Sequence, residues 1–275
     1  MSVINTNVKS MIAQNALTVN NRTLGKAMEQ LSTGKRINSA ADDAAGLAIG
    51  NRMTAQIKAL DQSVRNANDG ISMLQTAEGA TKEITNMLQR MRELSVQAAN
   101  DSYSSSDRTA IAGEMTQLTN EVTRIATNTQ WNGMAILSGA AAYSTMTFQV
   151  GTEGDATSAI TVGFSAMSAG ALTITALSVS TSVQAQASIE LLDTAITAVD
   201  TFRSGLGARV NRLTSAADNL ANVALNTSAS RSRIEDTDYA QTTTDLAKSQ
   251  IIQQAATAML AQANQAPQSV LSLLR

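Results

Sequence analysis

The sequence predicts a mainly α-helical protein whose N-terminal and C-terminal segments form a long antiparallel coiled-coil or helical-bundle rod, with a small β-hairpin region in the middle. Aromatic residues make up only 3% of the 275 residues and proline occurs once, a composition that permits helices. Towards both ends, apolar residues recur at alternating intervals of three and four, which is the spacing of a coiled-coil seam. Between residues 131 and 180 the period changes to two, which is typical of strands.

The first predicted helix carries three leucines at seven-residue intervals, Leu17, Leu24 and Leu31, with Met28 between the last two. This spacing predicts an amphipathic helix, and Gly34 supplies its glycine stop. We expect these four apolar side chains to form the N-terminal half of a terminal coiled-coil seam.

A second and much longer helix is predicted after this stop. Ser39 with Asp42 offers an N-cap and a first-turn acid. The apolar stripe then runs through Met53, Ile57, Leu60, Val64, Ala67, Ile71 and Leu74. After a register slip near Glu78 and Gly79, it resumes through Ala77, Thr81, Ile84, Leu88, Met91, Ser95 and Ala98. A continuous helix over this stretch would be on the order of 85 Å long.

The middle of the chain contains one more helix and the strands. A serine-rich break at residues 104–107 predicts a tight reversal and caps a helix with the stripe Ile111, Met115, Leu118, Val122, Ile125 and Thr129. Two alternating runs follow, on either side of turn residues 151–155, and they predict a β-hairpin: Met146, Phe148 and Val150, then Ile160, Val162 and Phe164. Thr181 and Gln184 fit a capping box that restarts helix.

The C-terminal part repeats the seam spacing twice. One stripe, with Arg203 as its charged interruption, runs through Leu192, Ile196, Val199, Leu206, Val210, Leu213, Ala217, Leu220, Ala224 and Thr227. The last stripe is Ile252, Ala256, Met259, Ala263, Ala266 and Val270, and we expect Pro267 to kink or weaken that helix.

Narrow apolar stripes gain stability only when a partner covers them, so the chain is expected to fold back once and to bring its termini together. Three regions are predicted: a terminal coiled-coil domain (1–39 plus 234–275), a helical rod domain (40–130 plus 181–233) and a variable hairpin segment (131–180). The outer helix faces carry small uncharged residues, which permit lateral contact between copies. A head-to-tail contact that does not close produces an open helical filament.

The composition also excludes several classes of function. The chain has no cysteine and no histidine, which removes thiolate catalysis and most hydrolase and zinc mechanisms. No HExxH, P-loop or GxSxG motif occurs in the middle segment, and we expect neither an enzyme nor a cofactor. The formal net charge of -2 gives no pull toward nucleic acid or an anionic membrane. Neither a secretory signal peptide nor a membrane span is expected.

Residues 31–49, LSTGKRINSAADDAAGLAI, closely resemble the N-terminal signature of flagellins. The resemblance continues through residues 66–80 (NANDGISMLQTAEGA), 89–100 (QRMRELSVQAAN), 132–133, 232–240 (SRIEDTDYA) and 261–275 (AQANQAPQSVLSLLR). It implies a subunit that self-assembles into the flagellar filament, with the terminal coiled coil lining the inner tube. It also implies export by the flagellar type III route, an extracellular location, a role in motility and outer domains that are nearly absent.

Partners and site residues follow from the same resemblance. The positions that match the surface bound by the vertebrate Toll-like flagellin receptor are Arg90, Leu94 and Glu114. From the helical spacing, the face opposite Leu88, Met91 and Ser95 is expected to be a solvated surface or a contact with other subunits, and it carries Gln89, Arg90, Glu93 and Gln97. Leu273, Leu274 and Arg275 resemble the part read by cytosolic flagellin sensors. The export chaperone, the cap protein and the hook-junction proteins are the further expected partners.

Two other functions remain open on the sequence alone. A hook-filament junction protein resembles flagellin at both termini, although the complete closing stretch favours a flagellin. A soluble coiled-coil adaptor would be folded and would stay monomeric or dimeric at high concentration. Sedimentation after seeding with filament fragments separates these functions.

Overall fold

The computed structural model describes residues 6–272, with side chains described for all of these except 142, 156 and 266–272. The chain divides into two compact units. One unit combines the N-terminal residues up to Ala55 with the C-terminal residues from Asn226, and the other contains Gln56–Leu225.

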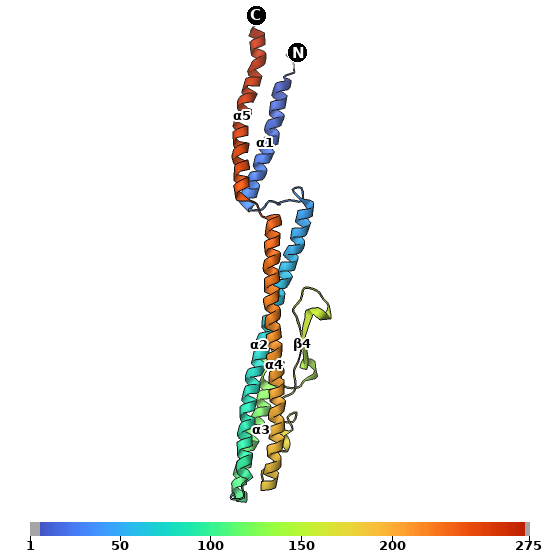
Figure 1. Ribbon diagram of the computed structural model, residues 1–275, viewed down its shortest axis with the longest axis vertical. Coiled ribbons are helices and arrows are strands. Elements are labelled where there is room, and N and C mark those ends of the chain that lie inside the picture. Colours follow the sequence, from blue (N-terminus) through green and yellow to red (C-terminus); the bar gives the residue numbers. More distant parts are fainter. Residues whose placement is uncertain (1–5, 273–275) are drawn as a thin grey trace. The chain divides into compact units, whose positions relative to one another are not determined.

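In the first unit, α1 (Val8–Thr33) and α5 (Tyr239–Ser272) lie side by side in antiparallel directions (Figure 1). Gly34 ends α1 in the left-handed region, at φ 72°, and its N–H donates to the Gln30 carbonyl over 2.9 Å. Extended backbone then joins the two chain segments: Lys35 pairs with Asp236, and the Thr237 N–H donates to the Gly34 carbonyl over 3.0 Å. These bonds set the antiparallel register at the base of the helix pair.

The start of α2 (Ala44–Ala98) differs from the expectation that Ser39 caps it. Asp43 is the capping residue, because its Oδ1 accepts the Gly46 N–H over 2.8 Å. Asp42 instead accepts the N–H of Ser39 over 3.0 Å and its hydroxyl over 3.1 Å, within the loop before the helix. A serine followed three residues later by an acid marks a turn as well as a helix start, so the pattern alone placed the cap four residues early.

The second unit contains most of α2, all of α3 (Ser105–Asn128) and most of α4 (Ser182–Glu235), side by side in Figure 1. The predicted reversal is confirmed: Ser104 and Asp107 form a reciprocal capping box at the start of α3. Arg108 supports the turn by donating to the carbonyls of Ala98, over 3.0 Å, and Asn100, over 3.1 Å. The resumed stripe of α2 is fully covered, with Ile84, Leu88 and Met91 at 0% exposure.

The predicted β-hairpin is also confirmed. Strands β3 (Thr145–Gln149) and β4 (Ala159–Gly163) pair antiparallel, with Met146 opposite Val162. The hairpin packs on α2, where the Asn66 amide donates to the Gln149 carbonyl over 3.0 Å. At Gly70 an added Cβ would lie 3.1 Å from Phe148 and 3.2 Å from Leu213, so this glycine permits close approach of hairpin, α2 and α4.

A second strand pair was not predicted. β1 (Gln130–Trp131) and β2 (Met134–Ala135) pair across Asn132 and Gly133, whose φ values are 48° and 77°. Positive φ at both central residues is the geometry that Asn-Gly favours in a two-residue hairpin. The dipeptide was therefore a sufficient signal, although each strand has only two residues. Short 3-10 turns, η1 (Ala141–Tyr143), η2 (Ala156–Ser158) and η3 (Ile174–Ala176), complete this region.

The limits of the two units differ from the expected domains. The boundary between the units falls within α2 and within α4. The first turns of α2 (residues 44–55) and the last turns of α4 (residues 226–235) therefore belong to the same unit as α1 and α5. Residues 131–180 belong to the second unit, and their apolar side chains, among them Val162 and Ile174, enter its core. α5 continues past Pro267 as far as Ser272.

Candidate assembly and recognition surfaces

The contact between α1 and α5 follows a strict heptad spacing and mixes leucine and alanine with polar residues. Its buried and half-buried positions are Ala13, Leu17, Asn20, Leu24, Ala27 and Leu31 on α1, and Thr242, Leu246, Ser249, Gln253, Ala256, Leu260 and Ala263 on α5. We call this set the terminal seam. Several members are small or polar, so the terminal seam buries little apolar surface.

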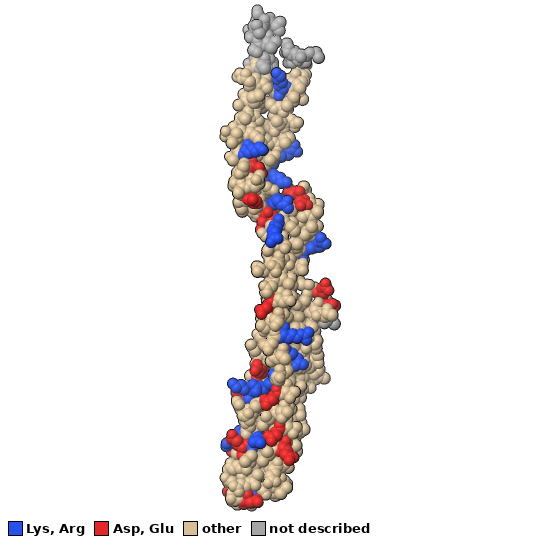
Figure 2. Space-filling model, in the orientation of Figure 1, with Lys and Arg blue, Asp and Glu red and all other residues tan. Residues whose placement is uncertain are grey.

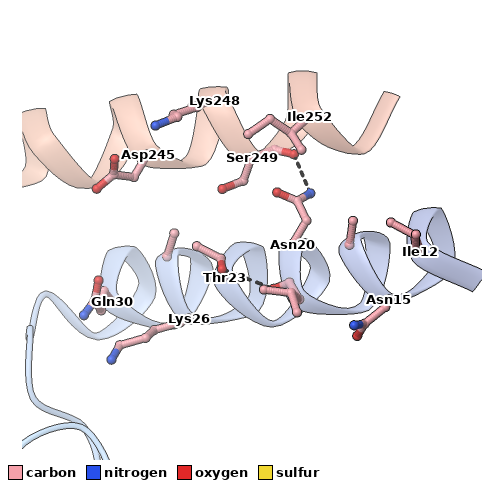
Figure 3. Close-up of a pocket in the computed structure, with 13 residues that line it drawn as sticks. Ile12, Asn15, Asn20, Thr23, Lys26, Gln30, Asp245, Lys248, Ser249 and Ile252 are labelled. Carbon is pink, nitrogen blue, oxygen red and sulfur yellow. Dashed lines mark hydrogen bonds between the residues drawn. The ribbon is translucent and has the colours of Figure 1, made fainter. Parts of the chain in front are cut away.

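Amide hydrogen bonds cross between α1 and α5. Asn20 is buried at 8% exposure and donates from Nδ2 to the Ser249 carbonyl over 2.8 Å (Figure 3). Asn7 makes the same contact with the Ala263 carbonyl, also over 2.8 Å. Sequence reasoning passed over Asn20 because it is polar, yet it stands three residues after Leu17 and four before Leu24. Its heptad position was the signal.

Three residues expected in this seam lie outside it. Met28, Ile252 and Met259 are 57%, 42% and 64% exposed. On α5 the seam follows the spacing of Ser249, Gln253 and Ala256, offset from the stripe of Ile252 and Met259 that apolar residues alone suggested. Leu17, Leu24 and Leu31 are half-buried on the α5 side, and the side chain of Val270 lies outside the described residues.

Several large apolar residues of these two helices are nevertheless exposed, whereas the leucines lie in the seam. The exposed set, here called the terminal apolar surface, comprises Val8, Met11, Ile12, Val19 and Met28 on α1, and Ile251, Ile252 and Met259 on α5. Exposed fractions range from 42% at Ile252 to 67% at Ile251. Single exposed apolar residues are normal, but eight of them distributed around one helix pair leave it with several apolar positions available for contacts with other chains.

Part of this surface borders a groove between α1 and α5 with a volume of about 750 Å³ (Figure 3). Both apolar and polar side chains line it, including Ile12, Val19, Asn20, Lys26, Lys248 and Ile252. The surrounding helix faces carry few charges: residues 10–21 and 249–272 contain none. Figure 2 shows this sparse charge over α1 and α5. Little like-charge repulsion would oppose contact with another helix here.

One ion pair fixes the loop after α1. Lys26 Nζ lies 2.8 Å from Asp42 Oδ1. This hydrogen bond, with a further one from the Ser39 N–H, lowers the pKa of Asp42 to about 2.

A second candidate surface lies on α2 and α3 around Arg90. Its guanidinium is 3.0 Å from Glu114 and 3.2 Å from Glu93, and these two hydrogen bonds, Glu114 first, raise the pKa of Arg90. All three side chains are about half exposed or more, at 51%, 47% and 69%. The structure thus brings together three of the six residues expected at this surface, in a geometry that leaves them open to a partner.

The other three residues differ from one another. Gln89 and Gln97 are exposed, and Gln97 donates from Nε2 to the Tyr103 hydroxyl over 3.1 Å. Leu94 is 2% exposed and belongs to the core of the second unit, so in this conformation it supports the surface from below and offers no contact area. It follows Arg90 by one helical turn, and sequence spacing alone did not separate the two environments. Leu273, Leu274 and Arg275 lie outside the described residues.

Neither surface contains the elements of a metal site. Among the described residues there is no group of three acidic, histidine or cysteine side chains that could hold a metal ion. Within residues 6–272, none of the helices has a stretch apolar and long enough to span a membrane.

Comparison with known proteins identifies the family. The profile of the bacterial flagellin N-terminal helical region matches residues 4–142, and that of the C-terminal helical region matches residues 189–274. The chain belongs to the bacterial flagellin family. A flagellin of this family is a structural subunit of the flagellar filament, and the family is not one of enzymes.

Individual flagellins match along the whole chain. A flagellin from Xenorhabdus nematophila is 46% identical over 315 residues, covering 100% of this chain and 99% of that protein. One from Halalkalibacterium halodurans is 43% identical over 273 residues, covering 99% and 100%, and is therefore of nearly the same length. The crystal structure of Bacillus cereus flagellin is similar at a TM-score of 0.50 and 32% identity, over 57% of this chain and 88% of that one.

Proposed function

We propose that this flagellin polymerises through its terminal helix pair into an extracellular filament that serves motility. The terminal apolar surface carries this proposal, because eight large apolar side chains remain exposed on α1 and α5 while the seam between the helices contains Asn20 and Ser249. A pair of helices with so little apolar burial is marginal by itself. Identical copies supply the missing contact area, through a heterologous contact that repeats along the filament.

The same proposal gives the expected partners and route. The subunit passes through the flagellar type III channel, with an export chaperone, and joins the filament beneath a cap protein and above hook-junction proteins. The absence of cysteine suits unfolded passage. Residues 131–180 enter the core of the second unit, so outer domains are nearly absent from this subunit.

Seeded assembly tests the proposal. Sheared filament fragments are added to monomer, and the critical concentration is read from the protein that stays soluble after sedimentation. Ile12→Asn and Ile251→Asn each remove apolar burial worth roughly 1.5–3 kcal/mol and should raise the critical concentration at least about tenfold. Val183→Asn is the matched control, because Val183 is 73% exposed but lies in the second unit.

The outcomes separate the functions considered. Protein that remains a compact monomer or dimer with seeds at every concentration is a soluble adaptor. Elongation that stops after a short zone indicates a hook-filament junction protein. Unlimited elongation whose critical concentration rises at least about tenfold in Ile12→Asn and stays unchanged in Val183→Asn supports the filament subunit.

We further propose that the Arg90 surface is a contact for neighbouring subunits and for the Toll-like flagellin receptor. Exposed, preorganised charge on Arg90, Glu93 and Glu114 supports this. Arg90→Ala should weaken receptor signalling by monomer, whereas Arg124→Ala, which removes a comparable exposed arginine paired with Glu121 on α3, should leave it unchanged. Equal signalling by both variants would refute the assignment. A chain ending at Ser272 tests in the same way whether Leu273, Leu274 and Arg275 are read by cytosolic sensors.

A further inference from the structure

Among the described residues, exposed methionines occur on α1 and α5 alone. Met11, Met28 and Met259 are 61%, 57% and 64% exposed, and all three lie on α1 or α5. Elsewhere in the described residues each methionine is buried or half-buried: Met73, Met91, Met115 and Met167 are at most 4% exposed, and Met53, Met87, Met134 and Met146 are intermediate. The exposed thioethers thus occur only on the terminal helix pair within the described chain.

We propose that Met11, Met28 and Met259 are oxidation sites at which a peroxide converts the subunit from an assembly-competent to an assembly-incompetent form. This inference rests on the proposed function of the terminal apolar surface, to which all three residues belong. Because the chain has no cysteine, no thiol competes for the oxidant. Thioethers are therefore leading targets, and susceptibility follows their exposure.

The reaction is a two-electron oxygen transfer. The thioether sulfur attacks one oxygen of hydrogen peroxide, an S–O bond forms and the O–O bond breaks. The proton on the transferred oxygen passes to the leaving hydroxide, which departs as water. Sulfur is oxidised to the sulfoxide as the peroxide is reduced, and methionine sulfoxide reductases reverse the change.

The location of the three residues gives this modification its effect. Met259 follows Ile252 by one heptad and so shares the α5 face that borders the groove. Met11 precedes the groove residue Ile12 and, at 61% exposure, lies on the side of α1 that faces away from α5. A sulfoxide is polar, and burying it against an apolar partner without a hydrogen bond is unfavourable. The same side chains are outside the α1–α5 seam, so their oxidation leaves the fold of the monomer intact.

Limited oxidation followed by seeded assembly tests the inference. Monomer is treated with dilute hydrogen peroxide, sulfoxides are mapped by peptide mass spectrometry, and the critical concentration is measured with unoxidised seeds. Sulfoxide should accumulate at Met11, Met28 and Met259 before Met73 and Met91. The critical concentration should rise at least about tenfold, as expected for losing the burial of one methionine side chain. Combined methionine sulfoxide reductases A and B should restore it, and circular dichroism should be unchanged.

Two variants sharpen the test. Met11→Leu with Met28→Leu and Met259→Leu removes the three sulfurs and keeps apolar side chains, so peroxide should no longer change its assembly relative to its own untreated sample. Met73→Leu with Met91→Leu removes two buried sulfurs and should remain sensitive. Equal loss of assembly in both variants after peroxide would place the damage elsewhere and overturn the inference.

The wild-type chain provides a measurement independent of variants. After partial oxidation and seeding, the three sulfoxides should be enriched in the soluble fraction over the pellet. Equal sulfoxide content in both fractions would overturn the inference while leaving the proposed function standing. Failure of untreated wild-type protein to elongate seeds would instead remove the proposed function, and this inference with it.

Discussion

The two units of this flagellin use the same heptad spacing to opposite effect. In the second unit the stripe positions hold Ile84, Leu88 and Met91, all at 0% exposure, and the helices cover one another. In the first unit the equivalent positions alternate half-buried leucines with alanines and with Asn20, Ser249 and Gln253, while eight other large apolar residues are exposed. Periodicity therefore determines which residues face the neighbouring helix, whereas residue type at those positions determines whether the contact is self-sufficient.

The largest expected effect is the difference in lost unfolding free energy between Leu88→Ala in the second unit and Leu24→Ala in the first. Leu88 is fully buried, so its truncation should cost roughly 2–5 kcal/mol of unfolding free energy through lost burial and a cavity. Leu24 is only half-buried in the terminal seam, and its truncation in the monomer should cost less than about 1 kcal/mol. Urea unfolding followed by circular dichroism measures both. Equal costs would show that the terminal seam is as self-sufficient as the core.

Gly70→Val tests the packing of the second unit alone. The added side chain would meet Phe148 and Leu213 from two different elements, so overpacking should cost roughly 1–3 kcal/mol and release the hairpin. Gly79→Val is the matched control on the same helix, because nothing lies within 4 Å of a Cβ at that position. Hydrogen exchange of the β3 amides reports the hairpin directly, and unchanged protection in Gly70→Val would contradict this account.

Asn20→Ala examines the polar seam. Loss of the hydrogen bond to the Ser249 carbonyl should destabilise the α1–α5 pair by about 1 kcal/mol. Asn20→Leu should instead strengthen the pair and loosen its register, since a buried polar residue at a seam position specifies alignment at a cost in stability. Disulfide trapping between engineered cysteines at seam positions in and out of register measures this. A single trapped register in Asn20→Leu would assign the alignment to other contacts, such as Asn7 with Ala263.

The pH dependence of the first unit is the smallest expected effect. Asp42 has a pKa lowered to about 2 by its hydrogen bond with Lys26. A folded-state pKa below the ordinary value of about 3.9 contributes stability that is present above pH ~4 and lost as pH falls toward ~2. Asp42→Asn should remove this dependence, and Asp245→Asn, at a half-buried residue of α5 that lines the groove, should retain it. Proteolysis of α1 across this pH range reports the change.

Much of the architecture was accessible from local sequence signals. The heptad stripes of α2 and α4, the capping box of Ser104 with Asp107 and the alternation around Met146 and Val162 all predict the elements that the structure contains. Such signals depend on a few neighbouring residues, so their physical cause is local. The Asn132-Gly133 hairpin carried an equally local signal that was overlooked.

The candidate surfaces were less accessible. Arg90 and Glu114 are 24 residues apart, and only the α2–α3 reversal brings them within 3.0 Å. Leu94 lies one helical turn from Arg90 and is nevertheless in the core, because tertiary packing in the second unit covers its side of α2. Their apolar character predicts that Met28, Ile252 and Met259 lie in the seam. They are exposed instead, because other positions of α1 and α5 face the opposing helix.

The sequence by itself determined that this protein consists of long helices with a short hairpin, and that neither cysteine nor histidine chemistry is available to it. The tertiary structure decided which side of each helix is covered. From the sequence alone, the only guide to which face of a helix is buried is the polarity of its residues. In α1 and α5, Asn20 is buried and hydrogen bonded to Ser249, whereas the apolar Ile12 and Met259 are exposed. The reason is that a seam is a property of two helices in register, and the partner residue is more than two hundred positions away in the chain.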